Sequence, residues 1–184
     1  ITDHNFRAAN PEWDDCRLKI QKLNDEHDGT MYITQGFIAS STSPKTTTTL
    51  GREGSDFTAA IFANCLDAEE LTIWKDVDGL RNADPKRFPD TQKIEHLSYF
   101  EAIELAFYGA SIIHPKTLKP LQNKDIPLKV RCFLDRDLAP SIIDGTENFI
   151  EYIPSFIVKE KQTLMSITAR DYSFMNEHNR ALFF

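Results

Sequence analysis

The chain has 184 residues, of which 41% are hydrophobic and 27% charged, a composition typical of a protein that buries a core. Its formal net charge is −7, so no overall basic field would attract nucleic acid or an anionic membrane. No apolar run approaches the roughly 20 residues that span a bilayer, and we therefore expect neither nucleic acid nor a membrane as a partner.

The cysteines and the two ends of the chain indicate its context. Cys16, Cys65 and Cys132 lie far apart without a CxxC spacing, which favours a reduced, cytoplasmic protein with no cysteine-based metal site. The chain begins at Ile1 without an initiator methionine or a signal-peptide pattern, and it ends on the apolar helical sequence NRALFF. We therefore expect an excised piece of a longer protein.

The N-terminal part predicts a helix, a strand and a loop. Asn10 is a suitable N-cap with Pro11 at the first helical position, and the apolar face of that helix continues to Gly29. The sequence 31–39 is rich in residues that favour strands, and Gly36 within it permits a close backbone approach. The polar stretch 40–49 predicts a loop.

Helices and strands then alternate. A helix is predicted over about 55–66, a strand over 70–76 and a turn-rich stretch over 77–92. Ser98 and Glu101 form the S-x-x-E capping box of a further helix that stops at Gly109.

The C-terminal half continues this alternation before the pattern changes. Pro115 begins another predicted helix, and 126–134 reads as a strand, so the alternation predicts an α/β fold with a mainly parallel sheet. After Ile153 one or two strands and a helix from about Tyr172 are expected. A domain boundary near 151–155 would divide the chain into residues 1–152 and 153–184.

A turn with the sequence LGREGSD precedes the second predicted helix. Gly51 and Gly54 free its backbone, and the exposed amides at the helix start can bind an anion. Arg52 can bind a carboxylate with two parallel hydrogen bonds. In the alternative interpretation, Ser55 caps the helix, Asp56 interacts favourably with its dipole, and Arg52 is merely solvated. The spacing alone leaves both open.

The segment WKDVDGLRNADPK places Lys75 and Asp76 at the carboxyl end of the predicted strand 70–76, where α/β sheets bind ligands. Its cations can hold phosphate, and its acids can hold ribose hydroxyls or, through water, Mg²⁺. Turn formation by Asp-Gly and Asp-Pro is the alternative explanation. In this segment Asp76, Asp78 and Asp84 alternate with Lys75, Arg81 and Lys86. His114, before Pro115, has no catalytic partner pattern and is interpreted as structural.

These motifs, in this order, resemble the aspartokinases of the amino-acid kinase superfamily. The matching segments are TQGFIA, TTTTLGREGSDFTAAIFA, IWKDVDGLRNADPK, LSYFEAIELAFYGASIIHPKTLKPL and IPLKVR, densely over 33–131. DVDG and LSYFEAIEL look closest to the kinase portion of bifunctional aspartokinase–homoserine dehydrogenases. The tail IVKEKQTLMSITARDYSFM is similar to the opening of a regulatory ACT domain. The resemblance implies the nucleotide-binding part of a three-layer α/β sandwich with a mainly parallel sheet, followed by the start of an α+β ACT domain.

The resemblance also implies a reaction and a set of site residues. The family phosphorylates the β-carboxylate of L-aspartate with ATP and Mg²⁺, giving aspartyl-4-phosphate at the head of lysine, threonine and methionine synthesis. Arg52 would bind an aspartate carboxylate, Gly54 and Ser55 would line the substrate, and Asp56 would orient the catalytic lysine. The positions that would hold ATP are Lys75, Asp76, Arg81, Asp84 and Lys86.

Three departures from the family pattern concern charge. Lys75 stands where the family usually has Thr, Arg81 where it has Tyr, and Ser111 where it has a phosphate-contacting lysine. Our hypothesis is that Lys75 or Arg81 supplies the missing charge.

The family's N-terminal segment of lysine and glycine has no counterpart in these 184 residues, so we expect the isolated chain to be inactive. A degenerate or regulatory nucleotide-binding module, or a superfamily member with another acid substrate, is the alternative. A longer parent is expected to form homo-oligomers through ACT domains.

Overall fold

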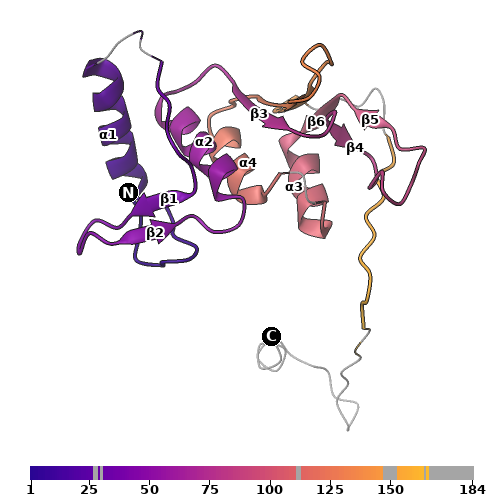
Figure 1. Ribbon diagram of the computed structural model, residues 1–184, viewed down its shortest axis with the longest axis horizontal. Helices are drawn as coiled ribbons and strands as arrows, with labels where there is room; N and C mark the ends of the chain where they lie inside the picture. The colour runs from indigo at the N-terminus through magenta and orange to yellow at the C-terminus, as the bar shows by residue number, and fades with distance from the viewer. Residues whose placement is uncertain (27–28, 30, 111–112, 147–152, 164, 166–184) are drawn as a thin grey trace.

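Helix α1 (Trp13–Glu26) stands beside a short two-stranded ribbon at the N-terminal end of the molecule (Figure 1). The computed structural model describes residues 1–26, 29, 31–110, 113–146, 153–163 and 165. Cys16 is buried on α1, and Trp13 and Ile20 pack against the same apolar cluster. The helix begins later than predicted, because the carbonyl of the expected N-cap Asn10 accepts from the Asp3 amide at 3.0 Å, and the first helical bond runs from the Cys16 amide to the Glu12 carbonyl at 2.9 Å.

The ribbon differs from the strand and loop predicted for 31–49. Strand β1 is Ile38–Ser40 and pairs antiparallel with β2, Thr47–Thr49, which lies in the predicted loop. The β-branched threonines suit a strand, and the buried Thr48 hydroxyl lies 2.7 Å from that of Thr2. Residues 31–36 are not a strand. Phe37 has a φ of 74°, which interrupts an extended run, and Ile33 is 94% exposed.

A four-stranded sheet forms the centre of the structure, in the order β3-β7-β8-β6. Its strands are β3 (Leu71–Lys75), β7 (Leu128–Cys132), β8 (Ser141–Asp144) and β6 (His96–Ser98). The β3–β7 and β6–β8 pairs are parallel, whereas β7 and β8 are antiparallel. The α/β class and the mainly parallel sheet are therefore confirmed, and β6 and β8 are additions to the prediction.

Helices α2 (Gly54–Cys65), α3 (Tyr99–Tyr108) and α4 (Pro115–Gln122) cover one face of this sheet (Figure 1). The main core lies between that face and the helices, where the fully buried side chains include Leu118, Leu121, Leu128 and Val130. The described residues thus contribute the sheet and one helical layer of the expected sandwich.

The predicted helix signals of α3 are confirmed. The Ser98 hydroxyl accepts from the Glu101 amide at 3.2 Å, and the Glu101 carboxylate accepts from the Ser98 amide at 2.9 Å. Gly109 ends the helix at a φ of 119°. His114, interpreted from sequence as structural, is the N-cap of α4, where its Nδ1 accepts from the Lys116 amide at 3.1 Å.

The turn-rich stretch contains a second small ribbon, β4 (Leu80–Arg81) paired with β5 (Lys93–Ile94). The buried Ser141 hydroxyl fastens this ribbon to the sheet. It accepts from the Leu80 amide at 2.9 Å and donates to the Ile94 carbonyl at 2.6 Å. The ribbon therefore has a fixed position relative to β8.

The C-terminal segment 153–163 runs along this turn-rich stretch without regular secondary structure. The helix predicted from Tyr172 and the residues 147–152 at the predicted boundary lie outside the described residues. Among the described residues, no helix has both the length and the apolar character needed to cross a membrane.

Candidate active site

The turn before α2 presents unpaired donors at the helix start. Gly54 donates its amide to the Gly51 carbonyl at 3.1 Å, which closes the turn. Within the described part of the chain, the amides of Ser55 and Asp56 make no hydrogen bond, and the exposed Arg52 guanidinium makes no hydrogen bond or ion pair. Free amides at a helix start and an unpaired guanidinium are suited to a carboxylate.

The alternative interpretation of the turn required Ser55 to be the N-cap of α2, and the structure shows that it is not. The N-cap is Glu53, which has a φ of 52° and makes no side-chain capping bond, and Ser55 already lies within the helix. Because Glu53 is in the left-handed conformation, the helix begins at Gly54, one residue earlier than predicted. Asp56 lies in the first helical turn, as predicted, where a carboxylate interacts favourably with the dipole.

The segment at Gly36 packs directly on this helix start. A Cβ added to Gly36 would lie 2.8 Å from the Cα of Ser55, and one added to Gly54 would lie 2.7 Å from the Phe37 ring. The Phe37 amide also donates to the Thr58 hydroxyl at 3.0 Å. The predicted close approach at Gly36 is therefore confirmed, and it holds the turn in place.

A cavity of about 710 Å³ lies between helix α3 and the loop after β3, which we call the cavity loop. The loop contributes charged groups, including Asp76, Arg81, Asp84 and Lys86, and α3 contributes an apolar wall of Ala102, Leu105 and Ala106. Four of the five residues that the resemblance implies for ATP thus line one cavity. The fifth, Lys75, does not line it.

Arg81 braces the loop instead of pointing a free charge into the cavity. Its Nε and Nη2 donate to the two carboxylate oxygens of Asp78 at 3.0 and 2.5 Å, and its Nη1 donates to the Thr91 carbonyl at 2.8 Å. The hydrogen bonds from Arg81 hold the pKa of Asp78 below its ordinary value. Sequence reasoning gave Asp78 no specific role, because its partner is identified only by the loop geometry.

Asp84 and Lys86 lie together at the rim of the cavity. The Lys86 amide donates to Asp84 Oδ1 at 2.9 Å, while both side chains are exposed. The Lys86 ammonium is therefore available to an anion, and the exposed carboxylate of Asp76 is available to a hydroxyl or a hydrated cation.

The C-terminal segment forms another wall of the cavity that the sequence did not indicate. Ser155, Phe156, Ile157 and Val158 line it. The Phe156 amide donates to the Asn82 carbonyl at 2.6 Å, and the Asn82 side chain donates to the Pro154 carbonyl at 3.0 Å. Arg87 and Glu160 form an ion pair at 2.7 Å further along.

Lys75 connects the cavity loop to the turn. It is the last residue of β3, and its Nζ lies 2.7 Å from Oδ2 of Asp56 in the first turn of α2. The two motifs therefore meet at the same end of the sheet. The sequence did not reveal this pair, because the partners are separated by 19 residues and by the β3–α2 packing.

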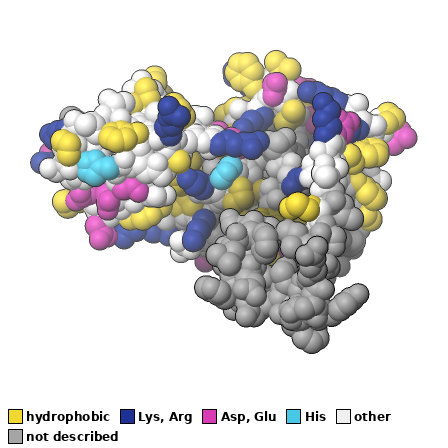
Figure 2. Space-filling view, turned by 90° about the horizontal axis from the view of Figure 1, so that it is seen from below, with side chains coloured by type: hydrophobic (Ala, Val, Ile, Leu, Met, Phe, Trp, Pro, Cys, Tyr) yellow, Lys and Arg dark blue, Asp and Glu magenta, His cyan; other side chains and the backbone are white. Residues whose placement is uncertain are grey.

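One face of the molecule carries clustered positive side chains (Figure 2) although the chain is acidic overall. Lys and Arg side chains gather in the central part of the face shown in Figure 2. Local positive charge of this kind favours anionic ligands.

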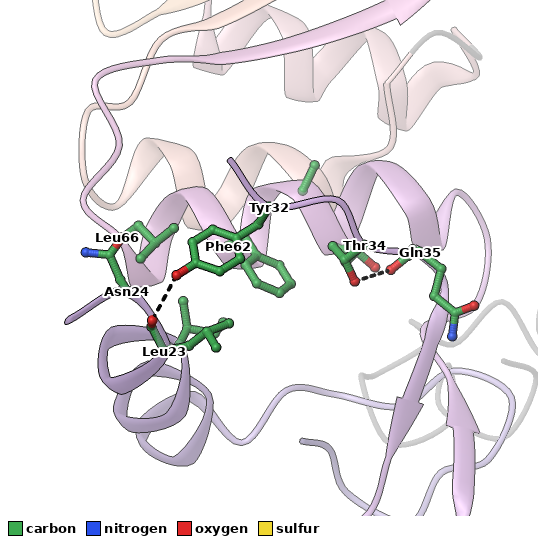
Figure 3. Close-up of a pocket in the computed structure, with 11 residues that line it drawn as sticks. Leu23, Asn24, Tyr32, Thr34, Gln35, Phe62 and Leu66 are labelled. Atoms are coloured by element: carbon green, nitrogen blue, oxygen red, sulfur yellow. Dashed lines mark hydrogen bonds between the residues drawn. The ribbon is translucent and has the colours of Figure 1, made fainter. Parts of the chain in front are cut away.

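A second cavity, of about 380 Å³, lies between α1 and α2 (Figure 3). Its labelled side chains include Leu23, Phe62 and Leu66, and the Tyr32 hydroxyl donates to the Leu23 carbonyl at 2.9 Å. Among the residues that the structure describes, no acidic or basic side chain lines this cavity. It lacks the charged groups that the cavity beside α3 provides.

The α/β fold and the charged cavity can now be compared with known protein families. The sequence matches the amino acid kinase family over residues 2–132, and the chain belongs to that family. Within it, a bifunctional aspartokinase/homoserine dehydrogenase 2 of Zea mays is 37% identical over 131 residues, which are 71% of this chain and 14% of the maize protein. Aspartokinase 1 of Arabidopsis thaliana is 33% identical over 152 residues, 81% of this chain and 27% of that protein.

The comparison with solved structures also finds aspartokinases. E. coli aspartokinase III in complex with aspartate and ADP matches with a TM-score of 0.74 and 37% identity, over 80% of this chain and 33% of that one. The resemblance to aspartokinases and the α/β fold class are thereby confirmed. The chain spans between 14% and 27% of the length of the two plant relatives.

Proposed function

We propose that this chain is part of an aspartokinase, in which the β-carboxylate of L-aspartate accepts the terminal phosphoryl group of ATP and forms aspartyl-4-phosphate. This reaction would belong to lysine, threonine and methionine biosynthesis. The observation that carries the proposal is the Lys75–Asp56 contact, which joins a carboxylate-binding turn to a cavity of nucleotide size. The relatives and the aspartate- and ADP-bound neighbour support it.

The turn before α2 would recognise aspartate. Arg52 is exposed and unpaired among the described residues, so it can bind one carboxylate with two parallel hydrogen bonds. The amides of Ser55 and Asp56 provide further donors. Gly54 keeps the backbone close to Phe37, where a side chain would not fit.

The cavity beside α3 fits a nucleotide. Its volume of about 710 Å³ lies within the range of roughly 300–1,000 Å³ usual for small-molecule sites. The apolar wall from α3 suits an aromatic base, and the exposed Lys86 provides a cation at the loop that Arg81 braces. Asp76 and Asp84 offer oxygens for ribose or for Mg²⁺ carried with the nucleotide, which would neutralise phosphate charge.

The chain's own residues would mainly position the reactants. Phosphoryl transfer depends on alignment and neutralisation of charge more than on a covalent group from the protein. Asp56 would hold a lysine ammonium at the reacting centre. In the family, that role of Asp56 serves a lysine from a segment without a counterpart in these 184 residues, so we propose that this chain alone does not phosphorylate aspartate.

We also propose how the longer parent protein is organised. Residues 1–152 would belong to the kinase domain and 153–184 would begin an ACT domain, through which the parent would form homo-oligomers. The cytoplasmic location is proposed from the cysteine pattern, and the two plant relatives carry chloroplastic names.

Calorimetric titration of the 184-residue chain tests the function. We expect binding of MgADP and of L-aspartate. Arg52→Lys keeps the charge but removes the bidentate geometry, so it should weaken L-aspartate binding about tenfold while MgADP binding stays within about twofold. Arg17→Lys, at an exposed arginine on α1, is the matched control and should change neither.

Each other result has a definite meaning. Absence of MgADP binding contradicts the kinase proposal. MgADP binding without L-aspartate binding favours a degenerate or regulatory nucleotide module. Tighter binding of L-glutamate than of L-aspartate favours a family member with another acid substrate.

A further inference from the structure

Lys75 has hydrogen-bonding capacity to spare. Its Nζ lies 2.7 Å from Oδ2 of Asp56, with the two side chains 27% and 15% exposed. An ammonium has three N–H donors, and Asp56 is its one partner in the described part of the chain. The ammonium is therefore oriented by a carboxylate and still accessible to an anion.

Arg81 is in the opposite condition. Of the five N–H donors of its guanidinium, four are engaged in the described part of the chain: that of Nε and one of Nη2 bind Asp78, and the two of Nη1 bind the carbonyl and the hydroxyl of Thr91. A phosphate would have to displace these bonds, which hold the loop. Among the described residues, Lys75 therefore keeps two N–H donors without a partner, whereas Arg81 keeps one and lies in the cavity as a brace of its loop.

The direction of Lys75 indicates which part of a ligand it would meet. Successive residues of an extended strand point to opposite sides. Asp76 lines the cavity, whereas the preceding Lys75 extends to the first turn of α2. The ammonium thus lies at the first turn of α2, and the backbone of residues 75–76 forms the junction between that turn and the cavity.

We propose that the Lys75 ammonium, oriented by Asp56, contacts the transferring phosphoryl group, and that Arg81 serves as a brace of the loop. This inference rests on the proposed function. In that reaction an aspartate carboxylate oxygen forms a bond to the terminal phosphorus, and the bond from that phosphorus to the bridging oxygen breaks. The electron pair of the broken bond leaves with ADP, and a cation at the junction stabilises the charge on the phosphoryl oxygens.

The test compares MgATP with AMP, which lacks the distal phosphates. Lys75→Met should lower the affinity for MgATP about tenfold to a hundredfold, the usual effect of losing a charge-assisted hydrogen bond, and leave AMP within about twofold. Lys75→Arg should retain most of the MgATP affinity. Arg81→Met should weaken MgATP and AMP alike, because it loosens the whole loop.

Two further variants separate contact from folding and from general charge. Lys75→Met with Asp56→Asn removes both charges, so the pair stays neutral overall and no unpaired carboxylate is left. If Lys75 touches the phosphoryl group, this double variant also loses the preference for MgATP over AMP. Lys129→Met is the matched control, because Lys129 lies on β7 and pairs with the exposed Glu70; it should bind like the wild type.

The outcomes distinguish the inference from the function on which it rests. If the wild-type chain binds neither MgATP nor MgADP, both are contradicted. If it binds them and the Lys75 variants keep the wild-type preference for MgATP over AMP, only the inference is overturned. An equal loss for MgATP and AMP in Lys75→Met would likewise overturn it, because the residue would then act on the fold and not on the phosphates.

Discussion

The Ser141 hydroxyl offers a sharp test of how the cavity loop is held. It is fully buried, accepts from the Leu80 amide at 2.9 Å and donates to the Ile94 carbonyl at 2.6 Å. Ser141→Ala removes both bonds from backbone groups of Leu80 and Ile94, whose side chains are themselves buried. An unsatisfied buried group costs about 1–3 kcal/mol, so we expect a loss of roughly 2–4 kcal/mol in the free energy of unfolding.

Urea unfolding followed by tryptophan fluorescence measures that loss. Ser40→Ala is the control, because the Ser40 hydroxyl donates at 3.2 Å to the carbonyl of its neighbour Ser41 on an exposed strand. The control should stay within about 0.5 kcal/mol of the wild type. Hydrogen exchange gives a second readout, since the Leu80 amide should lose its protection in Ser141→Ala. A loss below about 0.5 kcal/mol with the amide still protected would refute the reasoning.

Two further predictions concern pH. Tyr99 is buried, and burial, followed by the charges of two nearby carboxylates, raises its pKa to about 12. Between pH 10 and 12 the unfolded chain loses this proton while the folded chain keeps it, so stability falls by up to about 2–3 kcal/mol. Tyr99→Phe should remove that share of the alkaline loss in urea titrations at pH 9 and 11; parallel losses in both proteins would contradict this. Asp78 has a lowered pKa because Arg81 hydrogen-bonds its carboxylate, so its stabilising contribution is present above about pH 4 and disappears as the pH falls through the lowered value. Thermal melting between pH 6 and 3 should show a shallower decline for Asp78→Asn than for the wild type and for Asp90→Asn, an exposed control.

The features that the sequence predicted correctly are the local ones. The α3 helix was expected from its capping box and terminal glycine, which lie within one stretch of chain. Strands β3 and β7 were expected from apolar runs flanked by turns. The turn before α2 and the turn-rich stretch after β3 were expected because their glycines, acids and cations follow one another in sequence.

The features that were missed depend on contacts between distant parts of the chain. Strands β6 and β8 have three and four residues, too few to show a periodicity, and they form because each pairs with the other. The Lys75–Asp56 contact depends on how α2 packs against β3. The prediction for 31–39 was wrong in extent because an apolar run becomes a strand only where a partner strand is present.

The attachment of the cavity loop to Ser141 has a consequence for folding order. The Leu80 amide and the Ser141 hydroxyl are 61 residues apart in sequence, and the Ile94 carbonyl and the Ser141 hydroxyl are 47 residues apart. Closing such long loops costs conformational entropy before any contact compensates for it. The local helices can therefore form early, whereas the ribbon β4–β5 becomes fixed only when β8 has joined the sheet. By the same argument, this ribbon should be the first part of the core to open when the protein is stressed, so loss of the cavity beside α3 would precede global unfolding.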